Sequence, residues 1–187
     1  MEEKKIIING HEAVDLGLSV KWATCNVGAS KPEEFGDHFA WGETEPKDEY
    51  SDENYMFYDV INGRTYIDIG SVISGTEFDA ARELLGEDWR MPNEEELYEL
   101  LRECSWEMTT INGVKGYRVI GPNCNSIFLP AWIKNSQNDE YEEYWTGSFS
   151  DEDCHWDALC LEVTDDEHYS AYAMPYDGLL IRPVTDK

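Results

Sequence analysis

The chain has 187 residues, of which 41% are hydrophobic and 13% aromatic; this is enough to bury one full core and excludes a disordered protein. Its 40 acidic and 14 basic residues give a formal net charge of −26, which excludes nucleic acid and anionic membrane surfaces as partners. The length therefore predicts a single domain over residues 1–187, and the charge favours a soluble monomer.

The first apolar pattern predicts strands. Residues 13–27 alternate apolar and polar side chains, which is typical of a strand or a bent pair of strands. Gly17 marks the break between the two halves of this run. We therefore expect Trp22, in the second half, to lie near the core.

A short helix and a hairpin are expected next. Residues 32–35 begin with a proline that is followed by two glutamates, a pattern that favours the first turn of a helix. Further on, Asn62-Gly63 separates the apolar runs 57–61 and 65–69. An Asn-Gly pair between two such runs predicts a tight hairpin turn.

Two helices follow in close succession. Residues 77–85 carry apolar side chains at helical spacing and end at Gly86, a residue that suits the position after a helix. Asn93 and Glu96 have the spacing of a capping box at the start of the second helix. The apolar residues after it recur at helical spacing and predict one buried stripe: Leu97, Leu100, Leu101 and Cys104.

After Trp106 the helical patterns end and strand patterns replace them. Turn residues such as Asn112-Gly113 separate six short runs: 116–120, 126–130, 143–148, 157–163, 169–173 and 179–184. Helices that precede a series of short antiparallel strands indicate an α+β protein with two or three helices.

The last third of the chain contains the candidate ligand-binding residues. Not one Lys or Arg lies between Lys134 and Arg182, whereas acidic residues recur, so a ligand meets a negative field there. Tyrosines supply rigid contact area, and small polar residues adapt their hydrogen bonds. We predict a protein or peptide ligand that is basic or neutral, bound by Asp151, Asp153, Cys154, His155, Asp157, Tyr169, Ala171, Tyr172, Tyr176 and Asp177.

Metal and cofactor sites are not expected in this segment. Its alternating acidic residues imitate a calcium loop, but Trp156 stands at the sixth position, where the EF-hand turn needs glycine. The four residues Cys154, His155, Cys160 and His168 match no known spacing of zinc ligands. The chain has five cysteines, an odd number without a disulfide pattern, and we expect free thiols.

Seven phrases of the chain, taken in order, resemble one protein family. They are VDLGLSVKWATCNVGA at 14–29, FGDHFAWGE at 35–43, DWRMP at 88–92, NGVKGY at 112–117, NSIFLP at 125–130, YWTGS at 144–148 and IRPV at 181–184. In these phrases the chain is similar to the Fibrobacter succinogenes major paralogous domain family. The resemblance implies a C-type-lectin-like fold of the kind shared with formylglycine-generating enzymes.

The resemblance also implies how the chain closes and what it does. In lectin-like folds the two chain ends pair, so residues 14–22 should lie beside residues 179–184, with Arg182 held by an acid or by carbonyl oxygens. The chain further resembles variable proteins of diversity-generating retroelements, in which a C-terminal segment, here residues 144–184, is rewritten to change ligand choice. That implies display on a cell surface or a virion, whereas the start of this chain has no signal peptide and favours the cytoplasm.

Three hypotheses of function follow. The first is a non-enzymatic binding module without catalytic residues or a cofactor. The second is an enzyme of the formylglycine-generating type with Cys154 and His155 as a nucleophilic pair; adjacent residues of a strand point to opposite faces, which disfavours that pair. The third is a structural acidic domain without a dedicated ligand. No run of residues is apolar for the length of a membrane helix, so we expect no membrane insertion.

Overall fold

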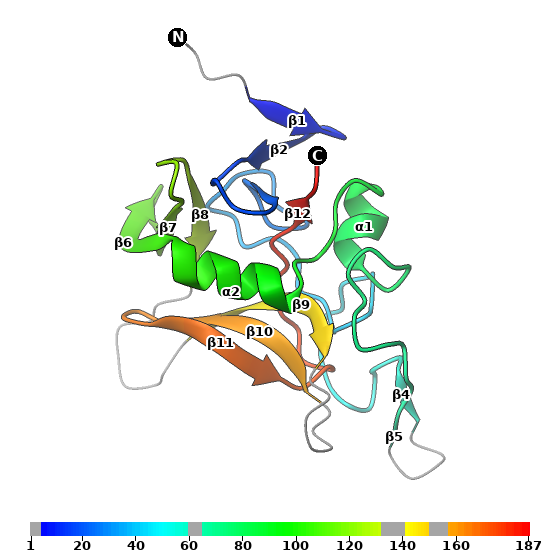
Figure 1. Ribbon diagram of the computed structural model, residues 1–187. Helices are drawn as coiled ribbons and strands as arrows, with labels where there is room; N and C mark the ends of the chain where they lie inside the picture. Colours follow the sequence, from blue (N-terminus) through cyan, green and yellow to red (C-terminus); the bar gives the residue numbers. More distant parts are fainter. Residues whose placement is uncertain (1–4, 60–64, 132–140, 150–156) are drawn as a thin grey trace.

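The chain forms a mixed α+β structure in which small antiparallel sheets surround one long helix (Figure 1). The structure, a computed structural model, describes residues 5–59, 65–131, 141–149 and 157–187. The described strands form a four-stranded sheet, two three-stranded sheets and a two-stranded ribbon. This confirms the predicted α+β class and its short antiparallel strands. None of the helices within these ranges has the length and apolarity needed to cross a membrane.

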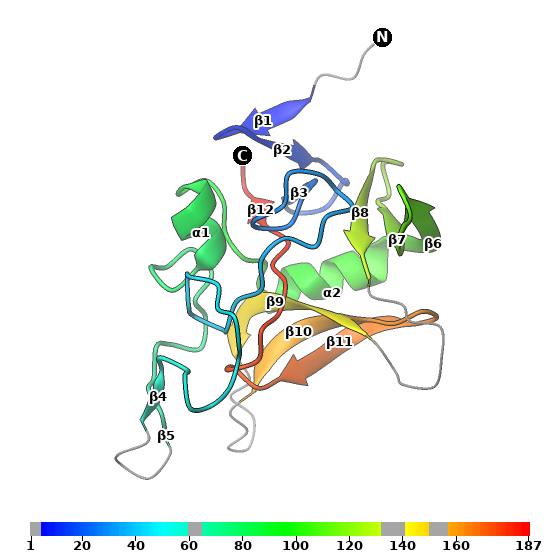
Figure 2. The ribbon, with the colours of Figure 1, turned by 180° about the vertical axis from the view of Figure 1, so that it is seen from behind.

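One sheet joins the two ends of the chain. It contains β1 (Ile6–Ile8), β2 (His11–Val14), β3 (Lys21–Ala23) and β12 (Val184–Thr185), in the order β1-β2-β3-β12. Val184 of β12 lies opposite Trp22 of β3, and Trp22 is buried in the core. The expected pairing of the chain ends and the expected position of Trp22 are therefore confirmed, and both ends lie at the same side of the molecule (Figure 2).

The predicted strand 179–184 is only partly present. Before β12, this run makes single bridges, Leu179 with Phe39 and Leu180 with Tyr144. Each bridge joins it to a different neighbouring segment, so no continuous ladder forms along one side. Pro183 lacks the amide hydrogen that a continuous ladder would need.

The two helices predicted at residues 77–85 and after Asn93 are both confirmed, although the first begins later than predicted. Helix α1 (Ala80–Leu85) begins later than expected because the carboxylate of Asp79 accepts hydrogen bonds from the amides of residues 81 and 82 and so caps the helix there. Gly86 follows α1 with a φ of 96°, a conformation that favours glycine. Helix α2 (Glu94–Glu103) begins with the predicted capping box, formed by Asn93 and Glu96.

The predicted helix at residues 32–35 is wrong. The segment forms a turn in which the amide of Glu34 donates to the carbonyl of Lys31. The Glu34 carboxylate accepts from the backbone amides of Ser30 and Lys31 and from the Ser30 hydroxyl, which closes the turn on itself. Gly36 then takes a φ of 79°, which ends any helical path after one turn.

The hairpins follow the turn residues. Strands β6 (Ser105–Ile111) and β7 (Val114–Ile120) are joined by Asn112 and Gly113, whose φ angles of 49° and 89° match the tight turn that an Asn-Gly pair predicts. Strand β8 (Ser126–Pro130) pairs with β7. Strands β4 (Tyr58–Asp59) and β5 (Thr65–Tyr66) pair as the hairpin prediction required, while its turn residues 62 and 63 lie outside the described residues.

One core cluster lies between α2 and the third sheet. That sheet contains β9 (Glu142–Phe149), β10 (Ala158–Val163) and β11 (His168–Ala173), in the order β11-β10-β9. Helix α2 lies along one face of it in both ribbon views (Figures 1 and 2). Leu97 and Leu100 are buried there with Leu159 and Leu161 of β10, which places the predicted helix stripe against the core.

This packing makes a prediction about stability. Leu100 has no exposed surface, so Leu100→Ala leaves a cavity and should lower the free energy of unfolding by about 2–5 kcal/mol. Leu84→Ala on α1 is the matched control, because 51% of Leu84 is exposed and its loss should change stability by less than about 0.5 kcal/mol. Urea denaturation measures both; equal effects of the two substitutions would contradict this position of α2.

Candidate functional site

The sheet β9-β10-β11 has two different faces. Side chains alternate along a strand, so successive residues of β11 point to opposite faces. On the α2 face, His168 stacks on Trp106 with ring centroids 4.2 Å apart, and Ser170 is hydrogen-bonded to the Tyr98 side chain of α2. Tyr172 follows on this same face. Residues 169, 171 and 173 belong to the other face.

The face away from α2 carries a cluster of carboxylates. The Tyr169 hydroxyl donates to Glu162, which lies opposite it on β10. The Cys160 thiol donates to Oε1 of Glu143 at 3.6 Å. Burial, and to a smaller extent the charges of Glu162 and Asp177, raise the pKa of Glu143 to about 7. These contacts place Asp177 beside the cluster and show that its acids are close enough to affect one another.

The same cluster changes the pKa values of nearby groups. The hydrogen bond to Glu162 raises the pKa of Tyr169 to about 12. The charge of Glu143 is the main cause that raises the pKa of Tyr141, and burial raises the pKa of Asp177. This face therefore attracts positive charge. Its half-buried Glu143 carboxyl keeps its proton to a higher pH than an exposed glutamate does.

A second cluster, which we call the tyrosine cluster, lies at the β4-β5 ribbon and contains Tyr55, Tyr58, Tyr66 and Tyr176. The rings of Tyr58 and Tyr66 are 5.0 Å apart, and those of Tyr55 and Tyr66 are 6.1 Å apart. Burial and, to a smaller extent, the nearby charges of Tyr176, Tyr58 and Asp157 raise the pKa of Tyr66 to about 12. Two predicted site residues, Asp157 and Tyr176, thus lie beside residues far away in the sequence.

A chain of buried hydrogen bonds positions the tyrosine cluster. The Trp145 indole of β9 donates to the carbonyl of Phe39 at 2.7 Å, and the Trp41 indole donates back to the carbonyl of Thr146 at 2.9 Å. The Tyr55 hydroxyl then donates to the carbonyl of Trp41 at 2.7 Å. Strand β9 therefore holds residues 39–41, and these hold Tyr55.

The loop before Tyr55 is fixed from the other side. The Tyr50 ring covers Gly178, where an added Cβ would come within 2.5 Å of the ring, so only glycine fits this approach. The Tyr50 hydroxyl donates to the carbonyl of His38. Lys47 forms an ion pair with the buried Glu43. The residues after β11 and the loop 43–55 are thereby packed together.

A cavity of about 430 Å³ lies beside the tyrosine cluster and shares Tyr55 and Tyr66 with it. Its lining is Trp41, Tyr55, Tyr66, Ile67, Asp68, Ile69, Gly70, Ser71 and Phe149. This volume, with a wall of four aromatic and two aliphatic side chains and one carboxylate, is typical of a site for one small group or one side chain of a partner.

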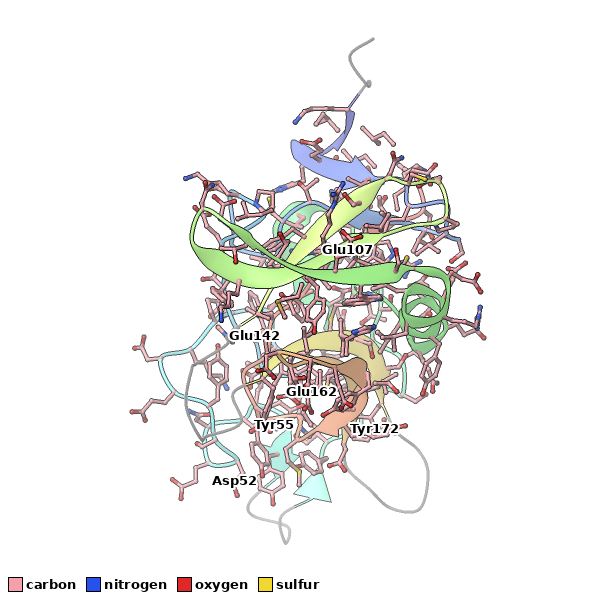
Figure 3. The ribbon with its side chains drawn as sticks, turned by 90° about the vertical axis from the view of Figure 1, so that its left-hand side faces the viewer. Asp52, Tyr55, Glu107, Glu142, Glu162 and Tyr172 are labelled. Atoms are coloured by element: carbon pink, nitrogen blue, oxygen red, sulfur yellow. The ribbon has the colours of Figure 1, made fainter. Side chains whose placement is uncertain are left out.

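The structure separates the predicted site residues into three groups. Asp157 and Tyr176 lie at the tyrosine cluster, Tyr169 and Asp177 at the carboxylate cluster, and Tyr172 on the α2 face. In Figure 3, Tyr172 lies in the same half of the view as α2, and Tyr55 and Asp52 lie in the other half. Ala171 packs against the core. Four predicted residues lie outside the described ranges: Asp151, Asp153, Cys154 and His155.

Sequence reasoning missed several residues that the fold adds to these groups. Tyr58, Tyr66 and Glu143 were not among the predicted site residues. The aromatic-rich stretch before the Asn-Gly turn is the signal that could have drawn attention to Tyr58 and Tyr66, because three of the four residues 55–58 are aromatic. Nothing in the sequence places that stretch next to Tyr176, since 118 residues separate Tyr58 from Tyr176.

The cysteines within the described residues are free thiols: Cys25, Cys104, Cys124 and Cys160. Burial raises the pKa of Cys104 to about 11 and that of Cys160 far above its ordinary range. Cys154 lies outside the described residues. Across the described ranges, no group of three His, Cys, Asp or Glu side chains is placed to hold a metal ion.

Comparison of the chain with protein-family models, with curated proteins and with solved structures finds no match.

The raised pKa of Glu143 predicts how stability depends on pH. In the unfolded chain this carboxyl titrates near its ordinary value of 4.5, whereas in the fold its pKa is about 7. Between these values the folded state binds the extra proton, so stability falls as pH rises through this window. In Glu143→Gln this part of the pH dependence should be lost, and the Tm should fall less between pH 5 and pH 8.

The control for this experiment is Glu107→Gln, which removes an exposed carboxylate from β6, in the other half of the molecule (Figure 3). Its Tm should follow the wild-type pH profile. Thermal melting monitored by circular dichroism measures all three proteins. If Glu143→Gln keeps the full wild-type slope, the carboxyl of Glu143 does not retain its proton in the fold.

Proposed function

We propose that the protein is a non-enzymatic ligand-binding protein whose C-terminal surface recognises a basic or neutral protein or peptide. The surface comprises the described part of residues 144–184 together with the β4-β5 ribbon that packs beside it. In this proposal the chain is a member of the Fibrobacter succinogenes major paralogous domain family, with a C-type-lectin-like fold, and is displayed on a cell surface or a virion. The paired chain ends and the irregular connections around small sheets support that fold.

One observation carries the proposal: exposed tyrosines and carboxylates lie on both faces of the sheet β9-β10-β11, in a part of the chain that has no Lys or Arg between residues 135 and 181. Tyr169 is 40% exposed and Tyr172 is 55% exposed, although both belong to a paired strand. Tyrosine is enriched among the residues that contribute most to binding energy, because it buries a large rigid area at a small entropic cost. An acidic rim adds attraction for a positively charged partner.

The position of the tyrosines also agrees with a surface that changes by mutation. Tyr169, Tyr172 and Tyr176 lie outside the buried core, whereas five of the six residues of the neighbouring strand β10 are buried. Substitutions at such positions alter contacts and leave the core intact. This supports diversification of the segment by a retroelement as part of the proposal.

Among the described thiols, Cys160 does not suit the nucleophile of a formylglycine-generating type of enzyme; Cys154, which that hypothesis named, lies outside the described residues. A nucleophilic cysteine needs access to solvent and a lowered pKa. Cys160 has no exposed surface, and burial raises its pKa. It donates to the half-buried Glu143, which is a structural use of a thiol.

The proposal predicts that tyrosine substitutions change the dissociation rate constant and that carboxylate substitutions change the association rate constant. Tyr172→Ala and Tyr176→Ala should each raise the dissociation rate and weaken binding by about 30-fold, which corresponds to about 2 kcal/mol. Asp165→Asn and Asp166→Asn remove exposed charges from the β10–β11 turn and should lower the association rate only at low salt. Surface plasmon resonance measures both rates.

The screen uses surface proteins and basic peptides as probes against the wild type and a variant with Tyr169, Tyr172 and Tyr176 changed to Ala. Met108→Ala is the matched control, because Met108 is an exposed large side chain on β6. Binding should be lost in the triple variant and kept in the control. Equal binding by all three proteins would place the ligand site elsewhere and leave the acidic domain without this function.

A further inference from the structure

Strand β11 forms the free edge of its sheet. It pairs with β10 along six residue pairs, from Ala158 with Ala173 to Val163 with His168. The sheet order β11-β10-β9 leaves its other side without a strand among the described residues. In an antiparallel pair, the amides and carbonyls of alternate residues point away from the neighbouring strand. The outer side of β11 therefore presents a row of backbone donors and acceptors.

The features by which proteins usually protect such an edge are missing from β11 itself. Protective devices include a lysine on the edge strand, a proline, a bulge or a very short strand. The sequence of β11 is HYSAYA, without Lys, Arg or Pro, and its register with β10 is regular over its whole length. The edge strand β1 differs, because it follows Lys5, whose ammonium group forms an ion pair with Glu12 of β2.

Both faces beside this edge carry tyrosines and carboxylates. On the face away from α2, Tyr169 bonds to Glu162 and lies near Glu143. On the α2 face, Tyr172 lies near Tyr98, and the nearby charge of Glu94 helps to raise the pKa of Tyr98. An added strand directs alternate side chains to the two faces, so basic side chains meet carboxylates on both.

We propose that β11 binds an extended basic segment of the partner protein as an additional strand of the sheet. Main-chain hydrogen bonds along β11 align the segment, and its Lys or Arg side chains pair with the acids on either face. The inference rests on the proposed binding function and names the mode of recognition and the chemistry of the partner. The acidic β10–β11 turn, residues 164–167, lies at one end of this edge and attracts the same kind of segment.

The charge of the chain disfavours a second copy as the occupant of this edge. An antiparallel pair of β11 strands would place the turn 164–167 of one copy near the end of β11 in the other, where Asp177 follows. Acids would then face acids at both ends, on molecules that each carry a net charge of −26. Like charges at such contacts oppose association.

Peptides with alternating Lys and Thr test this mode of binding. The first probe is a nine-residue peptide, the second is the same peptide with its central amides methylated, and the third has Glu in place of Lys. Methylation removes the hydrogen-bond donors and keeps the charge. The first peptide should bind at least 10-fold more tightly than the methylated one, and the third should not bind, as measured by fluorescence anisotropy.

Hydrogen exchange and one pair of variants locate the contact. Amides of β11 should gain protection when the first peptide is bound, whereas amides of β1, an edge strand of another sheet, should not change. Tyr172→Lys adds a positive charge on β11 and should lower the affinity for the first peptide at least 10-fold. Leu84→Lys adds the same charge at an exposed position on α1 and should not weaken it.

The outcomes separate this inference from the proposed function. Equal binding of the methylated peptide, or no binding of the basic one, would overturn strand addition while the tyrosine variants still test the binding surface. Protection of β11 that persists in the triple tyrosine variant would support strand addition and contradict the role of the tyrosines. A dimer that protects the β11 amides without peptide would show that a second copy occupies the edge.

Discussion

The guanidinium group of Arg182 joins three segments that are far apart in the sequence. Its Nε donates to the side-chain oxygen of Asn26 at 2.7 Å, and Nη1 donates to the carbonyls of Ala23 and Thr24 at 3.1 and 3.0 Å. Its Nη2 donates to the carbonyl of Phe128 at 3.0 Å. The end of the chain is thereby tied both to the segment after β3 and to β8.

Arg182 is only 1% exposed, and these acceptors are neutral oxygens. Burial lowers the pKa of the guanidinium to about 10, so the charge remains at neutral pH and is stabilised by directed hydrogen bonds. Lysine could not replace it, because one ammonium group cannot reach acceptors on both sides. The paired chain ends and the run 179–181 beside β9 depend on this group.

The sequence predicted the parts of the fold that are specified locally. The capping box at Asn93, the turn at Asn112-Gly113 and the stripe that contains Leu100 each depend on residues within a few positions of one another, and each is confirmed. The helix expected at residues 32–35 failed because the Glu34 side chain closes a turn that the helical pattern does not reveal. The pairing of the chain ends came from the family resemblance and not from periodicity.

The candidate site was harder to predict because it depends on contacts between distant segments. Sequence reasoning selected Tyr169 and Tyr172 together, yet their positions in a strand put them on opposite faces. It could not place Tyr66 beside Tyr176, since that contact depends on the residues after β11 packing against the segment 41–50. Nor could it place Glu143 beside Cys160, since pairing of β9 with β10 creates that contact. What it did predict is the charge of the surface, which is a property of composition.

The central claim is that the acidic, tyrosine-bearing surface of the last third is where a ligand binds. An unbiased selection from a library of displayed peptides of mixed charge tests it most directly, with the bound peptides sequenced and their contact mapped by hydrogen exchange. The account predicts that selected peptides carry a positive net charge and protect amides within residues 141–149 and 157–178. Selected acidic peptides, or protection confined to the sheet β6-β7-β8, would contradict it.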